Sequence, residues 1–234
     1  MKKFLLVPML GILGVLAVLV YFLLRRGGSP RDANVVEWIR HPQAHPDWVV
    51  KASTRCGNAP LVFPTDGYIG YLWRDTFDAS HLHQGIDIFG GGAPGSTAVF
   101  AAAAGFLSRQ ADWKSTLALR LPEDPLQPGR QIWLYYTHMA DSDGNSVIAE
   151  DYPPGVNEVF VKAGTLLGFQ GNYSGTAGSP VGVHLHFSIV LDDGRGNILN
   201  ELKVENTLDP SPYLGLNLNL DTQSIPTQVV VCRD

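Results

Sequence analysis

The most distinctive stretch of the sequence is Val183-His184-Leu185-His186-Phe187-Ser188-Ile189, which has the pattern of a β-strand. Side chains of a β-strand alternate between two faces, so His184, His186 and Ser188 share one face and the apolar residues share the other. Two imidazoles on one face need a group that uses their nitrogen lone pairs, and a divalent metal is the simplest such group. The alternative interpretation is a solvated strand face that carries two histidines by chance.

A second stretch, His83-Gln84-Gly85-Ile86-Asp87, offers a nitrogen and a carboxylate at a spacing that lets both converge on one ion. Gly85 permits a close backbone approach. Imidazole nitrogen and carboxylate oxygen together suit Zn²⁺. The spacing alone is a weak signal. With the His-x-His strand it supplies two histidines and one carboxylate, a catalytic zinc set that leaves one coordination position for water. His81 is the rival for the place of His83.

The remaining histidines have less distinctive surroundings. His138 ends an aromatic-rich run over 131–138, where a core histidine bonded to a backbone carbonyl is the competing interpretation. His41 and His45 stand beside prolines and are expected to be solvated.

Short β-rich runs separated by turn residues predict a mainly β, antiparallel fold. The expected strands cover residues 61–63, 116–121, 131–138, 159–171, 183–191 and 197–202, and a short helix is expected over 34–40. Residues 140–158 form a polar loop long enough to predict a functional wall or lid.

The N-terminal part contains an uncharged run of 21 residues, Phe4–Leu24. As a helix it would reach about 30 Å, the thickness of the hydrocarbon core of a bilayer. A cleavable signal peptide is the alternative, but its apolar core would be shorter and a small-residue cleavage site would follow. The predicted organisation is a membrane anchor (1–26), a tether (27–58), a catalytic domain (59–216) and a C-terminal extension (217–234).

Charge and cysteine usage limit the partners and the compartment. The chain has 17 Lys and Arg against 22 Asp and Glu, and four of the bases flank the apolar run, so the rest carries a net charge of −9. Such an acidic body excludes nucleic-acid binding. The two cysteines, Cys56 and Cys232, would close a long loop if they paired, which would place the domain outside the cytoplasm. Two free buried thiols are the alternative.

Three motifs together resemble the lysostaphin-like, or LytM-type, family of zinc peptidoglycan endopeptidases. They are His83-Gln84-Gly85-Ile86-Asp87-Ile88, Tyr136-Thr137-His138-Met139 and His184-Leu185-His186-Phe187. The supporting matches extend over about residues 60–215. Met139 in place of the usual leucine and the long 140–158 loop depart from the pattern, which leaves substrate choice open.

The resemblance implies a duplicated hybrid motif fold of antiparallel sheets, with the active site in a groove between loops. It implies that His83, Asp87 and His186 bind one Zn²⁺ per chain and that His138 and His184 act in catalysis. The expected substrate is a peptide of peptidoglycan, and the expected location is a single-pass membrane protein with its catalytic domain on the extracytoplasmic side.

The chain has no His-Glu dipeptide, so the glutamate base of an H-E-x-x-H helix is missing and a neutral histidine must accept the proton of water. His184, on the face of His186, is the first choice. Two alternatives remain: a catalytically silent scaffold of the same fold that regulates another wall hydrolase, and a lipoyl- or biotinyl-like carrier module.

Overall fold

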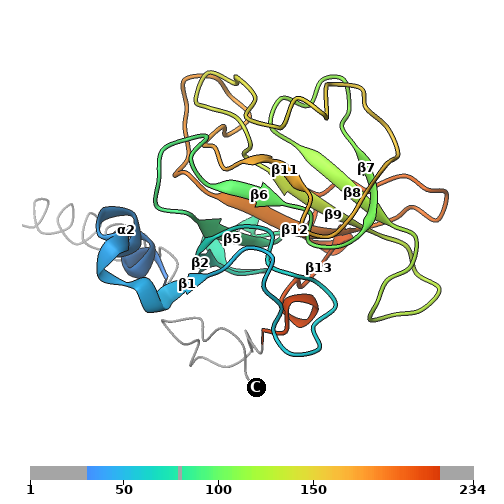
Figure 1. The fold of residues 1–234 in the computed structure, drawn as a ribbon, viewed down its shortest axis with the longest axis horizontal. Coiled ribbons are helices and arrows are strands. Elements are labelled where there is room, and N and C mark those ends of the chain that lie inside the picture. The colour runs from blue at the N-terminus through green and yellow to red at the C-terminus, as the bar shows by residue number, and fades with distance from the viewer. Residues whose placement is uncertain (1–30, 79–80, 217–234) are drawn as a thin grey trace, which may run out of the picture.

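The computed structural model describes residues 31–78 and 81–216 of the chain. Within this part a nine-stranded antiparallel sheet has the order β1-β2-β5-β12-β9-β8-β7-β10, with β13 paired to β12 (Figure 1). Its strands are β1 (Val49–Val50), β2 (Gly67–Tyr71), β5 (Ile86–Phe89), β7 (Gly105–Ser108), β8 (Leu117–Leu121), β9 (Ile132–Thr137), β10 (Val159–Val161), β12 (Leu185–Leu191) and β13 (Thr207–Leu208). Two small sheets pair β6 (Ala98–Phe100) with β11 (Leu166–Phe169) and β3 (Thr76–Asp78) with β4 (His81–Leu82).

Helical segments in the described part are short. They are the α-helix α2 (Asp32–Arg40) and the 3₁₀ turns η1 (Pro42–Ala44), η2 (Pro46–Trp48), η3 (Val204–Asn206) and η4 (Pro212–Leu214).

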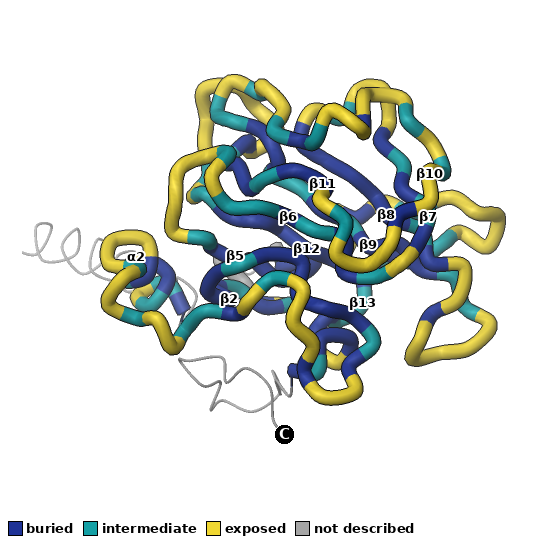
Figure 2. Tube along the Cα trace, viewed as in Figure 1, coloured by how far each residue is buried: buried dark blue, intermediate teal, exposed yellow. Residues whose placement is uncertain are grey.

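The two faces of the large sheet have different environments. On one face, alternate residues of the central strands pack against β6 and β11 and form the main core, which includes Leu119, Leu134 and Phe187. Figure 2 shows these central strands as the most buried part of the trace. On the other face the same strands carry polar side chains at one end and a small apolar cluster of Ala118, Trp133 and Val190 further along. Because the side chains of each strand alternate between the two faces, one face of the sheet forms the core and the other can carry a functional site.

β12 lies between β5 and β9 because its apolar alternate residues fill the main core. In this register His186 is the direct neighbour of Asp87 on β5 and of Thr137 on β9. Two segments about 100 residues apart are therefore joined by antiparallel pairing at the position of the predicted metal ligands.

Most of the predicted elements are confirmed. The helix expected over 34–40 is α2, and the strands expected over 116–121, 131–138 and 183–191 are β8, β9 and β12. The run 159–171 is divided into β10 and β11 by a turn in which Thr165 N–H donates to Lys162 O.

Two strand predictions are wrong. Residues 61–63 form no ladder because the N–H groups of Leu61, Val62 and Phe63 donate to three different segments of the chain. Residues 197–202 contribute only an isolated bridge between Ile198 and Asp192, because the Asn200 side chain accepts a hydrogen bond from Leu202 N–H and turns the backbone.

The segment N-terminal to residue 59 packs on the sheet. Trp38 of α2 donates its indole N–H to Phe89 O at 2.7 Å, and its ring lies 5.8 Å from that of Tyr68. Arg31 and Asp75 form a buried ion pair at 3.1 Å beside the helix. α2 thus covers the sheet beside β2 and β5, near the predicted site.

In residues 31–78 and 81–216, no helix is both long and apolar enough to cross a membrane. The predicted anchor and the C-terminal extension fall outside the described residues, and the domain boundaries stay predictions. Cys56 is disulfide-bonded, which excludes a free thiol there, while Cys232 lies outside the described residues.

Gly85 lies where the segment between His83 and Asp87 passes closest to β12. A Cβ at this position would clash with the carbonyl oxygen of Phe187 and lie 2.8 Å from the Cβ of Ser188. We therefore expect Gly85→Ala to lower the free energy of unfolding by about 1–3 kcal/mol, as overpacking usually does. Urea denaturation of the metal-free protein measures it. The matched control is Gly182→Ala, whose added Cβ meets side-chain atoms only at 3.4 Å and beyond. Equal effects of the two substitutions would contradict the prediction.

Candidate metal centre and active site

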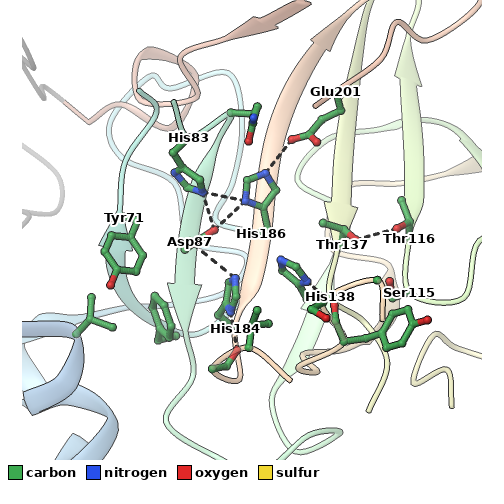
Figure 3. A pocket seen from close by; sticks show the side chains of 18 of the residues that line it. Tyr71, His83, Asp87, Ser115, Thr116, Thr137, His138, His184, His186 and Glu201 are labelled. Atoms are coloured by element: carbon green, nitrogen blue, oxygen red, sulfur yellow. Dashed lines mark hydrogen bonds and ion pairs between the residues drawn. The ribbon is translucent and has the colours of Figure 1, made fainter. Parts of the chain in front are cut away.

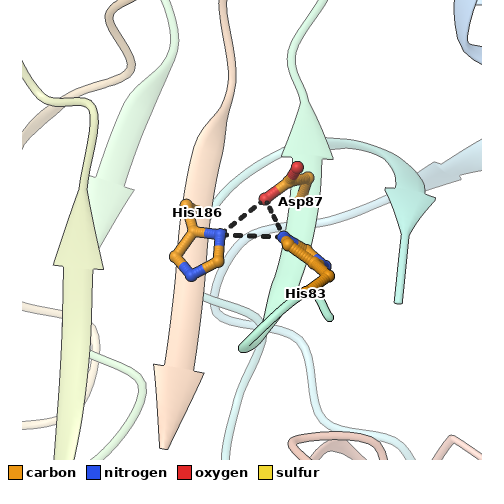
Figure 4. Close-up of side chains that lie close together, drawn as sticks. All are labelled: His83, Asp87 and His186. Carbon is orange, nitrogen blue, oxygen red and sulfur yellow. Dashed lines mark hydrogen bonds and ion pairs between the residues drawn. The ribbon is translucent and has the colours of Figure 1, made fainter. Parts of the chain in front are cut away.

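His83, Asp87 and His186 bring three metal-ligating atoms together on the polar face of the sheet (Figure 4). The distances are 3.0 Å from His83 Nε2 to Asp87 Oδ1, 2.8 Å from His186 Nδ1 to Asp87 Oδ1, and 3.0 Å between the two nitrogens. All three residues are at most 6% exposed. His83 completes the set, whereas the side chain of His81 lies outside the described part.

Hydrogen bonds behind the two rings fix which nitrogens face the cluster. His83 donates from Nδ1 to Leu72 O at 2.8 Å, and His186 donates from Nε2 to the Glu201 carboxylate at 2.9 Å. In the neutral rings the lone pairs of His83 Nε2 and His186 Nδ1 therefore point at Asp87 Oδ1. Three electron-pair donors at these distances repel one another unless a cation lies among them. The donor set fits a metal ion.

The electrostatics of His186 agree with this interpretation. Burial opposes the charged ring, but its hydrogen bonds to Asp87 and Glu201 outweigh burial and raise the pKa of His186 to about 10. Burial also opposes the charge of Asp87, yet the surrounding His83, His184 and His186 hold the pKa of its carboxyl well below the usual value. In the absence of a metal, a proton on His186 therefore supplies the positive charge that this site stabilises.

Two further histidines lie beside the cluster in a different arrangement (Figure 3). His184 donates from Nδ1 to Gly182 O, and His138 donates from Nδ1 to Tyr173 O, both at 2.6 Å. Each ring therefore keeps a lone pair on Nε2. That atom of His184 lies 3.6 Å from Asp87 Oδ2, and the centres of the two rings are 4.5 Å apart.

Both of these histidines are neutral at pH 7. Burial, together with His184 and His186, lowers the pKa of His138 to about 3. Burial also lowers the pKa of His184, against the opposing effect of Asp87. Each ring can therefore accept a proton at Nε2.

The backbone of His138 explains why it reaches the site. Strand alternation would place it with Tyr136 on the core side, but its φ of +68° turns the chain out of the strand. A non-glycine residue in this left-handed region is uncommon and often marks a functional position. His138 donates to a backbone carbonyl, as the alternative interpretation expected, but its ring lines the cavity of the site and lies outside the main core.

The five residues border a cavity of about 680 Å³. Its other walls come from α2 (Val35, Val36 and Ile39), the Tyr173–Gly175 loop, and Thr116 and Thr137, whose hydroxyls are 2.8 Å apart. The segment 140–158, expected to form a functional wall or lid, does not line this cavity, and its Ile148 and Tyr152 pack into the core instead. The contribution of α2 was not expected from the sequence.

Glu201 is the site residue that sequence reasoning missed. Its buried Oε1 accepts hydrogen bonds from His186 Nε2 at 2.9 Å and from the Ser188 hydroxyl at 3.0 Å. The only signal in the sequence is Ser188, which shares the face of His186 and needs a partner there. A carboxylate behind a ligating histidine orients the ring and makes it a stronger ligand.

We expect Glu201→Ala to lower metal affinity by about 10–100-fold, because His186 loses the acceptor that fixes its tautomer. Competition with a zinc chelator measures this affinity. Ser188→Ala is the control, because it removes a hydrogen bond to the same carboxylate and leaves the His186–Glu201 bond in place. Unchanged affinity in Glu201→Ala would show that His186 is not a ligand or does not depend on Glu201.

No protein-family model matches this chain, and no curated protein matches it. Solved structures do. Lysostaphin from Staphylococcus simulans is 20% identical, with 63% of this chain and 48% of that chain covered and a TM-score of 0.41. Its catalytic domain is 19% identical, with 68% and 93% covered and a TM-score of 0.40. Csd3 of Helicobacter pylori is 18% identical, with 71% and 40% covered and a TM-score of 0.41.

Lysostaphin belongs to the family that the sequence motifs resemble. The present chain spans about half the length of lysostaphin.

Proposed function

We propose that this protein is a zinc-dependent endopeptidase that hydrolyses peptide bonds in peptidoglycan stem peptides or cross-bridges. The observation that carries the proposal is one cavity that contains three converging metal-ligating atoms and, next to them, two neutral histidines with accepting nitrogens. Hydrolysis of a peptide bond needs both parts, a Lewis acid and a proton acceptor.

His83 Nε2, Asp87 Oδ1 and His186 Nδ1 would hold the ion, and two nitrogens with one carboxylate oxygen leave a fourth position open. When bound, zinc would polarise the peptide carbonyl and lower the pKa of water in that position. Leu72 O and Glu201 keep both imidazoles in the ligating tautomer. Both imidazoles are therefore already oriented toward the ion's position before it binds.

His184 is the proposed general base. It accepts at Nε2 the proton that the attacking water loses, and the nearby Asp87 carboxylate stabilises the resulting imidazolium. Gly182 O holds the ring by accepting from Nδ1, so the only nitrogen that can take the proton faces the site. The same proton then passes to the nitrogen of the leaving amine, which restores the neutral ring.

His138 has the same tautomer, and burial lowers its pKa as well. In its neutral form it accepts rather than donates at Nε2, so it would share in proton transfer and would bind a developing oxyanion only after protonation. Its ring stands beside His184, which is consistent with a role as second proton acceptor.

The substrate and location are also part of the proposal. The motif resemblance points to peptidoglycan, and the disulfide-bonded Cys56 favours an oxidising compartment outside the cytoplasm. A membrane anchor over 1–26 would keep the catalytic domain near the wall. The silent-scaffold alternative is less favoured because silent relatives typically lack one or more ligands, whereas His83, Asp87, His138, His184 and His186 are all present.

The test is to incubate the purified full-length protein with peptidoglycan, with and without a chelator, and to identify released muropeptides by mass spectrometry. Cleavage that stops with the chelator and returns with Zn²⁺ would support the proposal. Metal binding with no released fragment would favour the scaffold instead.

A further inference from the structure

A second hollow, of about 440 Å³, lies on the same face of the large sheet as the metal cluster. Its walls include Ser108, Trp113, Arg120, Trp133, Asn157 and Asn197. Arg120 on β8 and Trp133 on β9 belong to this face because they continue the alternation of Thr116, just before β8, and of Thr137, which line the catalytic cavity.

The spacing between the two cavities matches the length of a short peptide. Thr137 in the catalytic cavity and Trp133 in the second hollow are four residues apart on β9, which is about 14 Å at the rise of an antiparallel strand. An extended peptide of four residues spans about the same distance. A substrate whose scissile bond lies at the metal could therefore reach the second hollow with a group about four residues away.

The lining of the second hollow combines aromatic rings with polar groups. Trp133 is buried and donates its indole N–H to Asp192 at 3.0 Å, so it forms a fixed wall. Trp113 is half-buried and meets Tyr135 edge-on, with ring centres 5.8 Å apart. The volume of the hollow is within the range of small-molecule sites.

Hydrogen bonds from the Arg109 side chain hold the segment that carries Trp113 in place. Buried Arg109 donates to the carbonyl oxygens of Trp113 and Lys114 on one side and of Tyr152 on the other. On the opposite rim, the Ser108 hydroxyl donates to Asn157 Oδ1 and accepts from Glu158 N–H. Both rims are therefore preorganised before any ligand binds.

Several polar groups on these rims remain available. In the described part of the chain, no hydrogen bond is formed by the Gln110 side chain, by the Trp113 indole N–H or by the Asn157 NH₂ group. Arg120 is different, because Glu158 pairs with its guanidinium and neutralises its charge. The hollow thus offers neutral hydrogen-bonding groups and an aromatic edge, which favours a neutral polyhydroxylated ligand over an ion.

We propose that this second hollow is a subsite for a sugar ring of the glycan strand, linked to the peptide whose scissile bond lies at the metal cluster. The proposal rests on the proposed function. A pyranose ring has an apolar face that can pack on Trp113. Its hydroxyl and acetamido groups can form hydrogen bonds with Gln110 and Asn157. The stem peptide supplies the connection along β9, where Thr137 in one cavity wall and Trp133 in the other are about 14 Å, or four residues, apart.

Two substrates test the proposal, a stem peptide with its N-acetylglucosaminyl-N-acetylmuramyl disaccharide and the same peptide without sugar. We expect kcat/KM for the sugar-bearing peptide to be higher by about tenfold, through a lower KM with kcat unchanged. Trp113→Ala and Asn157→Ala should each reduce that advantage without changing cleavage of the sugar-free peptide. Trp113→Phe should keep part of it, and Leu126→Ala, on an exposed loop, is the control.

Direct titration with the disaccharide alone, followed by NMR, separates this proposal from the proposed function. If both peptides are cleaved equally and the disaccharide does not bind, the sugar subsite is wrong and the endopeptidase proposal stands. If neither peptide is cleaved, the endopeptidase proposal fails. The titration then decides the subsite by itself: binding that Trp113→Ala and Asn157→Ala weaken upholds it, and absence of binding overturns it.

Discussion

Asp87→Asn is expected to lose both zinc binding and peptidoglycan cleavage, the latter by at least about 10³-fold. Asp87 Oδ1 is the only anionic atom of the three-atom cluster and lies within 3.0 Å of both imidazole nitrogens. A neutral amide of the same size removes that charge, and the loss of a bound Lewis acid is worth several kcal/mol of transition-state stabilisation. Zinc content by mass spectrometry and muropeptide release are the measurements.

Folding must be checked because Asp87 is buried among histidines. Asp143→Asn, at an exposed position, is the matched control for charge, and circular dichroism of both variants checks the sheet. A folded Asp87→Asn protein that keeps one tightly bound zinc would contradict the assignment of the ligand set.

His184→Gln is expected to lower kcat by about 10²–10⁴-fold while the protein keeps its zinc. The glutamine cannot take a proton at the position of Nε2, but none of the three ligating atoms is removed. His138→Gln should reduce kcat less, because its ring is not next to Asp87, whereas His184 Nε2 lies 3.6 Å from Asp87 Oδ2.

Steady-state kinetics with zinc-loaded protein separate the two histidines. A loss in kcat with little change in KM is the expected pattern for a residue that acts in the transition state. Full activity in His184→Gln with zinc retained would remove His184 as the base. If only His138→Gln were inactive, the two roles would be exchanged.

Most of the ligand set could be predicted from local patterns, whereas the choice of His186 over His184 as the ligand followed only from the family resemblance. Strand alternation places His184, His186 and Ser188 on one face, and the glycine between His83 and Asp87 allows that segment to approach β12. Both features can be read from a few consecutive residues. The antiparallel pairing that joins them also follows from the β-rich pattern, although the register of His186 beside Asp87 does not.

Other parts of the site depend on contacts that no short pattern records. Glu201 reaches His186 from an irregular segment that the alternation suggested was a strand. His138 faces the cavity through a left-handed backbone conformation, which its sequence neighbours do not predict. The packing of α2 on β2 and β5 is a tertiary contact, so a segment expected to be a tether provides a cavity wall.

The most direct test of the metal centre is X-ray diffraction from zinc-loaded crystals at wavelengths on both sides of the zinc absorption edge. We expect one anomalous peak per chain, bounded by His83 Nε2, Asp87 Oδ1 and His186 Nδ1. A zinc-loaded crystal with no peak there, or with its peak at other residues, would contradict the account.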